Sequence, residues 1–440
     1  MKNGILLIVL FSVTMLKSSG FSQTVETPYE IGTWLGFRPV AVSYTFDDGC
    51  ANQFAVAIPM FDEFNFKLTL FTVTSPTWET PPDWEKLQAA ADSGHEVASH
   101  TVTHTSFTGM DDETQEAELK DSKEHIETNV VGHHCITMAY PYCNVGNRSI
   151  CKKYYIAARG CSGQVEKSTP TDFMNTCCFL CGTNHGVKTA QHFISKCESG
   201  INSNGWTIFL IHGIDDDGGY SPVTSDVLRE SLEYLDVNRD TYWVATYRNV
   251  AQYIKERNSA SVSESFADDN TITVQVTDTL DNELFNMPIT IRRPLPDGWL
   301  SADVTQNGHA VNKRVVEIDQ VKYVMFDVVP DSGNVIITKS EDTPVQHMGA
   351  LTNPVPSASQ NFPNPFNPTT TIEFSLPEKE TVHLSLFNSL GQMVKEHFYH
   401  ELAKGRHRIT LDASDLIAGQ YICKLQIGSF VDMKKIIVSK

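Results

Sequence analysis

Two segments of the chain combine carboxylates and imidazoles at spacings that suit a metal site. Asp47 and Asp48 are adjacent and precede Gly49, and because like charges disfavour joint ionisation, a bound cation would relieve their repulsion. His100 and His104 are four residues apart, a spacing that puts both rings on one side of a helical turn. One carboxylate with two neutral imidazoles binds a divalent metal and leaves coordination positions open for water and substrate.

Two further segments carry groups that could serve the same site. One is Ala139-Tyr140-Pro141-Tyr142-Cys143 and the other is Leu210-Ile211-His212-Gly213, and both follow apolar runs. Each of the four segments also has a plain structural interpretation: a solvated turn, a surface histidine pair, a loop opened by proline, or a structural histidine. Because all four follow predicted strands, one shared site is a better explanation than four coincidences.

The elements that would position these residues alternate between strands and helices from Pro39 to about Asn258. This alternation implies a parallel sheet, and about 220 residues with seven units favour a closed or nearly closed barrel with its chemistry at the carboxyl ends of the strands. The predicted strands are Val40–Phe46, Lys67–Val73, His95–Ser99, Ile136–Tyr140, Tyr154–Ala158, Thr207–Ile211 and Tyr242–Thr246. The predicted helices are Pro82–Asp92, Asp112–Asn129, Ser221–Asp236 and Asn249–Arg257.

The rest of the chain is predicted to be all-β. Alternating apolar and polar residues between turns indicate a small antiparallel sandwich and then, beyond a proline-rich linker, a second all-β unit. The strands expected in the sandwich are Thr271–Val276, Met287–Arg292, Lys322–Val328 and Asn334–Thr338. Those expected in the last unit are Thr371–Ser375, Val382–Asn388, His407–Leu411, Tyr421–Ile427 and Lys434–Val438.

Composition places the chain among ordinary globular proteins with an acidic surface. Its 440 residues are 41% hydrophobic and 20% charged, which excludes a disordered or collagen-like chain. The 34 Lys and Arg against 53 Asp and Glu give a net charge of −19. Because such a surface repels phosphate backbones, we expect no nucleic-acid partner.

The N-terminus predicts export. Lys2 precedes the uncharged stretch Gly4–Leu16, and small residues up to Ser22 then form a cleavage site typical of a signal peptide. The stretch is short for a membrane span, although an N-terminal anchor stays open, and we expect no transmembrane segment in the mature chain.

Cysteine usage fits an exported protein. Nine of the ten cysteines lie between Cys50 and Cys197, and outside the cytosol we expect most of them to form disulfides. The alternative is a zinc ribbon at Cys178-x-x-Cys181, which lacks a second such pair.

Taken together, the four polar segments resemble the polysaccharide deacetylases, the NodB-homology proteins of carbohydrate esterase family four. The resemblance spans about Pro39 to Arg257. It implies a distorted (β/α) barrel, in agreement with the seven strands counted above. The expected fold class is therefore α/β: a distorted (β/α)7 barrel followed by two small all-β sandwich domains.

The resemblance also implies a role for each residue. Asp48, His100 and His104 would hold a divalent metal, commonly zinc, and Asp47 would be the general base. His212 would be the general acid that protonates the leaving group. The Pro141-Tyr142 turn would present the backbone N–H of Tyr142 to the oxyanion, where one good donor is worth about 3 kcal/mol.

Two departures from the family pattern bear on activity. Many members carry an arginine that contacts the base two residues before the proline of the third segment, where this chain has Ala139. The aspartate that orients the catalytic histidine also lacks a clear match, and Asp172 lies in the right region without being assigned. Base activation therefore stays open. The acidic loop Asp215–Asp217 is interpreted as a solvated turn, with attraction of a cationic glycan as the alternative.

The C-terminal unit resembles the sorting domain of type IX secretion. The resemblance rests on four segments: Asn361–Pro368, Leu386–Gln392, Gly419-Gln420-Tyr421 and Lys434–Val438. It implies export across the outer membrane, a secreted or cell-surface location, and the type IX machinery as a partner. A glycan-binding sandwich is the alternative. The expected division is a signal peptide (1–22), the barrel (23–258), a β-sandwich of unknown role (259–342), a linker (343–370) and the sorting domain (371–440).

The expected function is a secreted, metal-dependent deacetylase that removes N-acetyl groups from an amino-sugar polymer related to chitin or peptidoglycan. One alternative acts on O-acetyl esters, as in acetylated xylan, with the same metal site. Another is a non-catalytic glycan-binding surface protein that keeps the barrel. The sequence does not identify the polymer.

Overall fold

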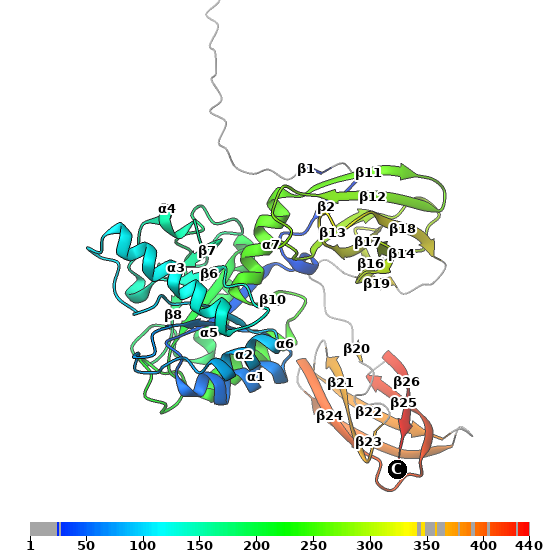
Figure 1. Cartoon of the computed structure of the whole chain (residues 1–440). Helices are drawn as coiled ribbons and strands as arrows, with labels where there is room; N and C mark the ends of the chain where they lie inside the picture. Colours follow the sequence, from blue (N-terminus) through cyan, green and yellow to red (C-terminus); the bar gives the residue numbers. More distant parts are fainter. Residues whose placement is uncertain are drawn as a thin grey trace, which may run out of the picture.

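The computed structural model describes residues 24–25, 28–340, 345–347, 357–358, 366–376, 379–388, 392–402, 405–427 and 430–439. The predicted signal peptide and most of the predicted linker lie outside these residues. The elements form three groups: a helix-covered sheet, two sheets beside α7, and two C-terminal sheets (Figure 1).

A parallel sheet forms the first group and contains all seven strands predicted for it. Its order is β7-β6-β5-β4-β3-β9-β8, and β10 pairs with the first part of β3. The strands are β3 (Val40–Asp47), β4 (Thr69–Thr72), β5 (Glu96–Ser99), β6 (Thr137–Ala139), β7 (Ala157–Arg159), β8 (Phe179–Leu180), β9 (Trp206–Ile211) and β10 (Tyr242–Val244). Only the short β8 was not predicted.

The sheet curls until a single segment of the chain contacts both of its edges. Thr176 bridges Arg159 of β7 in parallel, and a few residues later Phe179 and Leu180 of β8 pair with β9. This curled sheet of parallel strands confirms the expected distorted barrel.

Helices cover the sheet, and side-chain caps mark where the main ones begin. Asp83, Asp111, Thr224 and Thr246 each accept a hydrogen bond from a backbone N–H of the first turn, as N-cap residues do. The helices are α1 (Ile58–Glu63), α2 (Trp84–Asp92), α3 (Asp112–Asn129), α4 (Arg148–Cys151), α5 (Ala190–Ser199), α6 (Ser225–Val237) and α7 (Tyr247–Ser259). The four predicted helices correspond to α2, α3, α6 and α7.

Short tight helices complete this region. They are the single turns η1 (Leu35–Phe37), η3 (Pro141–Cys143) and η4 (Ile201–Ser203), and the π-helical segment η2 (Gln53–Ala57). None of the described helices combines the length and the apolar character that crossing a bilayer requires.

Strand β3 shows how the barrel separates its two faces. All eight residues are buried, as expected for a parallel strand covered on both sides. Val42, Tyr44 and Phe46 belong to the apolar core beneath the helices. Because successive side chains alternate, Thr45 and Asp47 point to the other face, into the barrel interior.

The middle region consists of two sheets packed face to face, as predicted. One has the order β1-β11-β12-β18-β14-β15 and the other β19-β16-β17-β13-β2. Their strands are β1 (Thr24–Val25), β2 (Glu30–Ile31), β11 (Ser261–Ala267), β12 (Thr271–Thr277), β13 (Ile289–Pro294), β14 (Ser301–Gln306), β15 (His309–Ala310), β16 (Lys313–Ile318), β17 (Val321–Val328), β18 (Val335–Ser340) and β19 (Val345–His347). Strands β1 and β2 join these sheets although they lie within the range predicted for the barrel domain.

The C-terminal region has two further sheets, with the orders β20-β21-β24 and β23-β22-β25-β26. The strands are β20 (Ser357–Ala358), β21 (Thr369–Leu376), β22 (Glu380–Phe387), β23 (Met393–Leu402), β24 (Gly405–Asp412), β25 (Gly419–Ile427) and β26 (Phe430–Val438). They enclose a core of their own. All five strands predicted here are present, and β20 and β23 are additional.

The cysteines depart from expectation. Among the nine between Cys50 and Cys197, one disulfide forms, between Cys143 and Cys161, and the other seven are buried free thiols. The expectation that most of them pair is therefore wrong. The Sγ of Cys178 lies against the carbonyl oxygen of Gly160, and that of Cys181 against the carbonyl oxygen of Phe179.

Candidate metal centre and active site

Strand β3 delivers two carboxylates to the carboxyl edge of the barrel. Asp47 is its last residue and is buried, whereas the side chain of Asp48 is 20% exposed. Asp48 and Gly49 both have left-handed backbone angles, with φ of 73° and 72°. Asp is among the few non-glycine residues that tolerate this conformation. The reversal turns the chain immediately after the strand, so adjacent carboxylates enter different surroundings.

The two histidines follow β5 in a tight loop, and the expectation that they sit on a helical turn is wrong. Thr101 and His104 have φ of 67° and 57°, which no α-helical turn contains. Hydrogen bonds hold the loop: the N–H of His104 donates to the hydroxyl of Thr101, and the carboxylate of Glu118 accepts from the N–H groups of residues 102 and 103. The predicted neighbourhood of the rings is confirmed, with centroids 4.7 Å apart.

One oxygen of Asp48 and one nitrogen from each histidine lie within 4.8 Å of one another. The Nε2 atoms of His104 and His100 lie 3.5 and 3.7 Å from Asp48 Oδ1. The Nδ1 of His100 donates to the carbonyl of Ala139 at 2.8 Å, which leaves its Nε2 lone pair directed at the group.

A divalent metal fits this group. Asp48 Oδ1 is buried and has no hydrogen-bond partner among the described residues, so a cation would satisfy it. Two imidazoles and a carboxylate are a ligand set that zinc accepts. Within the described part of the chain, no other set of three His, Cys, Asp or Glu side chains gathers in this way.

The electrostatics of the site favour cation binding. Burial, assisted by the negative charge of Asp47, raises the pKa of Asp48 to about 7. Burial lowers the pKa of His100 to about 3 and also lowers the pKa of His104. Both imidazoles are therefore neutral at pH 7, as metal ligands must be.

Asp47 has a partner that the sequence analysis missed. Arg159, the last residue of β7, donates to Asp47 Oδ1 at 2.9 Å and to Oδ2 at 2.5 Å, and both side chains are buried. Burial by itself would raise the pKa of Asp47, but the charge and hydrogen bonds of Arg159, together with His100 and His212, outweigh burial and lower that pKa to about 2. Asp47 is thus an ionised carboxylate at neutral pH.

His212 follows β9 and faces the same carboxylates. Its Nε2 lies 3.8 Å from Asp48 Oδ2, and burial lowers its pKa against the opposing charge of Asp47. Gln53 donates to the carbonyl oxygens of both Asp47 and His212, at 2.5 and 3.0 Å, and so ties the ends of β3 and β9 together. The Nδ1 of His212 is buried without a hydrogen-bond partner among the described residues.

Asp172 does not supply that partner. Its carboxylate contacts the guanidinium of Arg148 at 2.5 Å and accepts from the backbone of Met174. The acidic loop is also largely committed to backbone groups: Asp215 accepts from the N–H of Ser225 at the start of α6, and Asp217 from those of Gly219 and Asn52.

The third segment lies beside the histidines. Pro141 is buried, and Tyr142 has a φ of 53° inside the turn η3. The exposed ring of Tyr142 is 4.7 Å from the ring of His104, and Trp78 contacts the same imidazole at the same distance. The disulfide from Cys143 to Cys161 fastens this loop to the segment directly after Arg159. The oxyanion role of the Tyr142 N–H stays a prediction.

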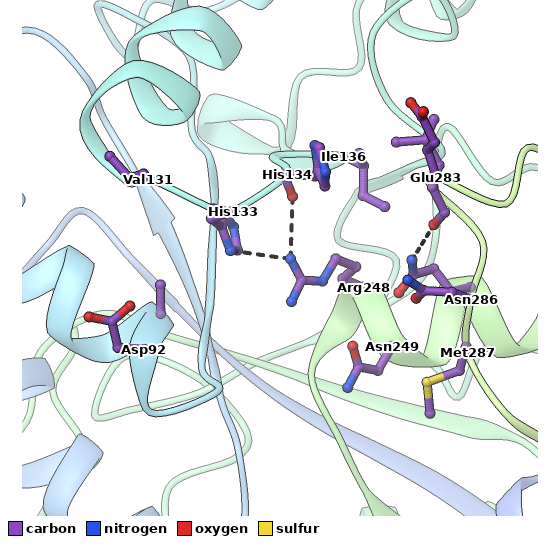
Figure 2. A pocket seen from close by; sticks show the side chains of 14 residues that line it. Asp92, Val131, His133, His134, Ile136, Arg248, Asn249, Glu283, Asn286 and Met287 are labelled. Atoms are coloured by element: carbon purple, nitrogen blue, oxygen red, sulfur yellow. Dashed lines mark hydrogen bonds between the residues drawn. The ribbon is translucent and has the colours of Figure 1, made fainter. Parts of the chain in front are cut away.

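Two hollows differ in their relation to this site. A hollow of about 210 Å³ adjoins Asp48 and is bordered by Thr72, Thr80 and Lys86. Figure 2 shows another, where β5 and β6 begin, at the opposite edge of the sheet. There Arg248 donates to His133 Nδ1 and to the His134 carbonyl, at 3.3 Å each. This second hollow includes none of the predicted site residues.

The structure therefore brings Asp47, Asp48, His100, His104, Tyr142 and His212 to one edge of the barrel. Two participants escaped the sequence analysis. For Arg159 a signal was present, since it is a lone charge directly after the apolar run Tyr154–Ala158. Gln53 carried no such signal because it lies in an irregular helix after the Asp-Asp-Gly turn.

Comparison with known proteins gives two domain matches. Residues 37–155 match the family model of polysaccharide deacetylase, and residues 360–439 match that of the secretion system C-terminal sorting domain.

Gellan lyase from a Bacillus species is 30% identical over 345 residues, which cover 73% of this chain and 14% of gellan lyase. YxkH from Bacillus subtilis (strain 168) is 28% identical over 101 residues, which cover 23% of this chain and 36% of YxkH. This chain thus spans a small part of either relative. Among solved structures, the Xyl-CE4 domain of a multidomain xylanase from the hindgut metagenome of Trinervitermes trinervoides matches with 18% identity and a TM-score of 0.35, covering 48% of this chain and 88% of that domain.

The raised pKa of Asp48 predicts how zinc affinity depends on pH. Below about pH 7 the metal-free Asp48 is protonated while the imidazole of His100 stays neutral, so zinc must displace the proton of Asp48. Affinity should then fall about tenfold per pH unit below pH 7 and level off above it. Titration with ZnCl2 against a competing chelator at pH 5 to 8 measures this. In Asp48→Asn the slope should flatten, and a slope that persists there contradicts the assignment.

The disulfide predicts an effect on stability that is separate from zinc binding. The Cys143→Ser/Cys161→Ser variant loses a cross-link between residues 18 apart, so its free energy of unfolding should fall by about 3 kcal/mol while zinc affinity stays unchanged. Denaturant titration and zinc binding measure the two quantities. Cys197→Ala, which removes a buried free thiol, is the control and should cost less. Lost zinc affinity in the double variant would show that the cross-link also shapes the metal site.

Proposed function

We propose that this chain, which contains a polysaccharide deacetylase domain and a secretion system C-terminal sorting domain, is a secreted, metal-dependent hydrolase of N-acetyl groups in an amino-sugar polymer. The observation that carries the proposal is the gathering of Asp48, His100 and His104 beside a separately paired Asp47. The sorting domain supports a secreted or cell-surface location through the type IX system.

The metal would polarise the scissile carbonyl and make water a better nucleophile. The chain's own residues supply the proton transfers. Asp47, held ionised by Arg159, takes the proton of the attacking water as its oxygen bonds to the carbonyl carbon. The backbone N–H of Tyr142 is proposed to donate to the oxyanion that develops.

His212 completes the reaction as the general acid. An amine is a poor leaving group unless it is protonated, so Nε2 of His212 would donate a proton to the nitrogen as the carbon–nitrogen bond breaks. A histidine whose pKa lies below its usual range gives up that proton readily. The products are acetic acid and the free amine of the sugar. Asp47 then returns its proton to solvent and His212 takes one up from solvent, which restores both groups.

One observation favours hydrolysis of O-acetyl esters as a second candidate. His212 Nδ1 lacks a carboxylate partner among the described residues, so nothing there stabilises a protonated imidazole from behind. An alkoxide depends less on a general acid than an amine does. Acetylated xylan or a similar glycan is therefore the alternative substrate. A purely glycan-binding protein is disfavoured because the metal-ligand group and the Asp47–Arg159 pair are both complete.

Acetate release from chitin oligomers, peptidoglycan and acetylated xylan, measured in parallel with zinc supplied, separates these candidates. We expect release from an N-acetylated polymer. Release from xylan alone would support the esterase. If none of the three substrates yields acetate while the protein holds zinc, the glycan-binding interpretation takes precedence.

Two substitutions separate metal binding from proton transfer. His104→Ala should lose both zinc and activity because it removes a ligand. Asp47→Asn should keep zinc and lose at least about 100-fold in kcat because it removes the base. Acetate release and bound zinc per chain are the measurements, with the exposed His134→Ala and Asp226→Asn as matched controls. Normal turnover by Asp47→Asn would remove the general-base assignment.

A further inference from the structure

The side chain of Arg159 crosses the barrel interior to reach Asp47. It starts on β7, and the sheet order places β6, β5 and β4 between β7 and the β3 strand that carries Asp47. Its guanidinium meets the carboxylate with two nitrogens, donates to the Thr45 hydroxyl at 2.6 Å and lies 4.8 Å from the ring centroid of Phe71 on β4. A planar fork held at several points fixes the plane of the carboxylate that it contacts.

Small residues make room for this crossing. Ala98, Ala139 and Ala157 lie on β5, β6 and β7, and all three are fully buried. Ala139 is the register partner of Arg159 on the neighbouring strand, so their side chains leave the sheet on the same side. At this level of the barrel, β6 therefore carries only the methyl group of Ala139, whereas β7 carries the guanidinium of Arg159.

We propose that Arg159 is the positioning residue of the catalytic base: from β7 it orients the Asp47 carboxylate toward the metal centre, a task for which β6 offers only Ala139. The inference rests on the proposed function, since Asp47 is a base only if the site hydrolyses a substrate. Arg159 itself is placed to touch Asp47 and acts through it.

The geometry distinguishes this role from simple charge neutralisation. Asp47 Oδ2, which accepts from Arg159, also lies 3.5 Å from Nε2 of His100, so the ion pair fixes where the base stands relative to a metal ligand. A lysine could neutralise the carboxylate, but its single ammonium group could not hold both oxygens in one plane.

Kinetics of Arg159 variants test the proposal. Arg159→Met should keep one zinc per chain and a KM within about threefold of the original, while kcat falls about 100-fold. Arg159→Lys, which keeps the charge, should fall by about 10-fold because the fork is lost. Arg229→Met, which removes an exposed arginine paired with Glu63 on the same barrel, is the control and should change nothing.

A double variant asks whether Arg159 acts through Asp47. In an Asp47→Asn background, where the base is already gone, adding Arg159→Met should lower the residual rate less than about threefold. An additional loss as large as that of Arg159→Met alone would overturn the proposal, and so would normal kcat in the single variant. If Arg159→Met does not fold, the same two comparisons with Arg159→Lys decide.

Moving the arginine from β7 to the neighbouring position on β6 is a rescue experiment. The Ala139→Arg/Arg159→Ala variant exchanges the two register partners, so it should recover at least about tenfold of the kcat that Arg159→Ala loses. If the exchange variant folds and binds zinc but recovers no kcat, the result counts against the proposal that an arginine at this level of the barrel orients Asp47.

A crystal structure of zinc-bound Arg159→Met, or of Arg159→Lys if that variant alone folds, gives a readout that needs no turnover. The Asp47 carboxylate should rotate away from His100, and an unchanged carboxylate would overturn the proposal. This readout also separates the two hypotheses. If the unsubstituted protein releases no acetate from any substrate, the proposed function fails while the structure still reports whether Arg159 orients Asp47.

Discussion

The site depends on keeping two neighbouring carboxylates in different electrostatic surroundings. Asp47 and Asp48 share a peptide bond, and their mutual repulsion would normally push both toward protonation. The protein resolves this by pairing Asp47 with a buried guanidinium, whereas no lysine or arginine among the described residues pairs with Asp48, so that the pKa of the first falls to about 2 and that of the second rises to about 7. One carboxylate is thereby committed to the charged form, and the other can exchange its proton for a metal ion. The left-handed turn at Asp48 makes the division possible, because it sends adjacent side chains into separate environments.

The barrel supplies what this division requires. The side chain of Arg159 needs space inside the barrel, and the buried alanines on β5, β6 and β7 provide it. Its backbone is held in place by the parallel pairing of β7 with β6. Gln53 binds the carbonyl groups at the ends of β3 and β9, and the disulfide binds the loop after β6 to the segment after β7. Each connection joins chain segments that approach the site from different strands, so the residues proposed as base, metal ligands and acid are held by a common frame.

The elements that the sequence predicted well were those with strong local signals. Strands such as β3 and β9 are continuous apolar runs, which a doubly covered parallel sheet demands, and α3 is delimited by its capping Asp111. The histidine spacing correctly predicted that the rings are neighbours, although a loop rather than a helix achieves it. Local signals could not reveal partners far along the chain. The lone charge of Arg159 after an apolar run marks it as unusual, but Arg159 and Asp47 are 112 residues apart, and that charge does not indicate which residue it pairs with. The disulfide prediction failed because the number of cysteines fits an exported protein but does not show which of them lie close enough to pair. The roles of all the site residues, Pro141 and Tyr142 included, and the domain limits remain predictions.

Helix α7 closes the chain of the barrel and packs onto the middle sheets. Tyr253 and Ile254 of α7 share one buried apolar cluster with Ile289 and Ile291 of β13, and the hydroxyl of Tyr253 donates to the carbonyl of Gly32 beside β2. A fragment that ends at residue 258 would lack β13 and would expose the apolar face of α7 to solvent. Boundaries drawn from motif similarity alone are therefore a poor guide to which fragment will stay in solution, because the middle sheets cover an apolar face of α7.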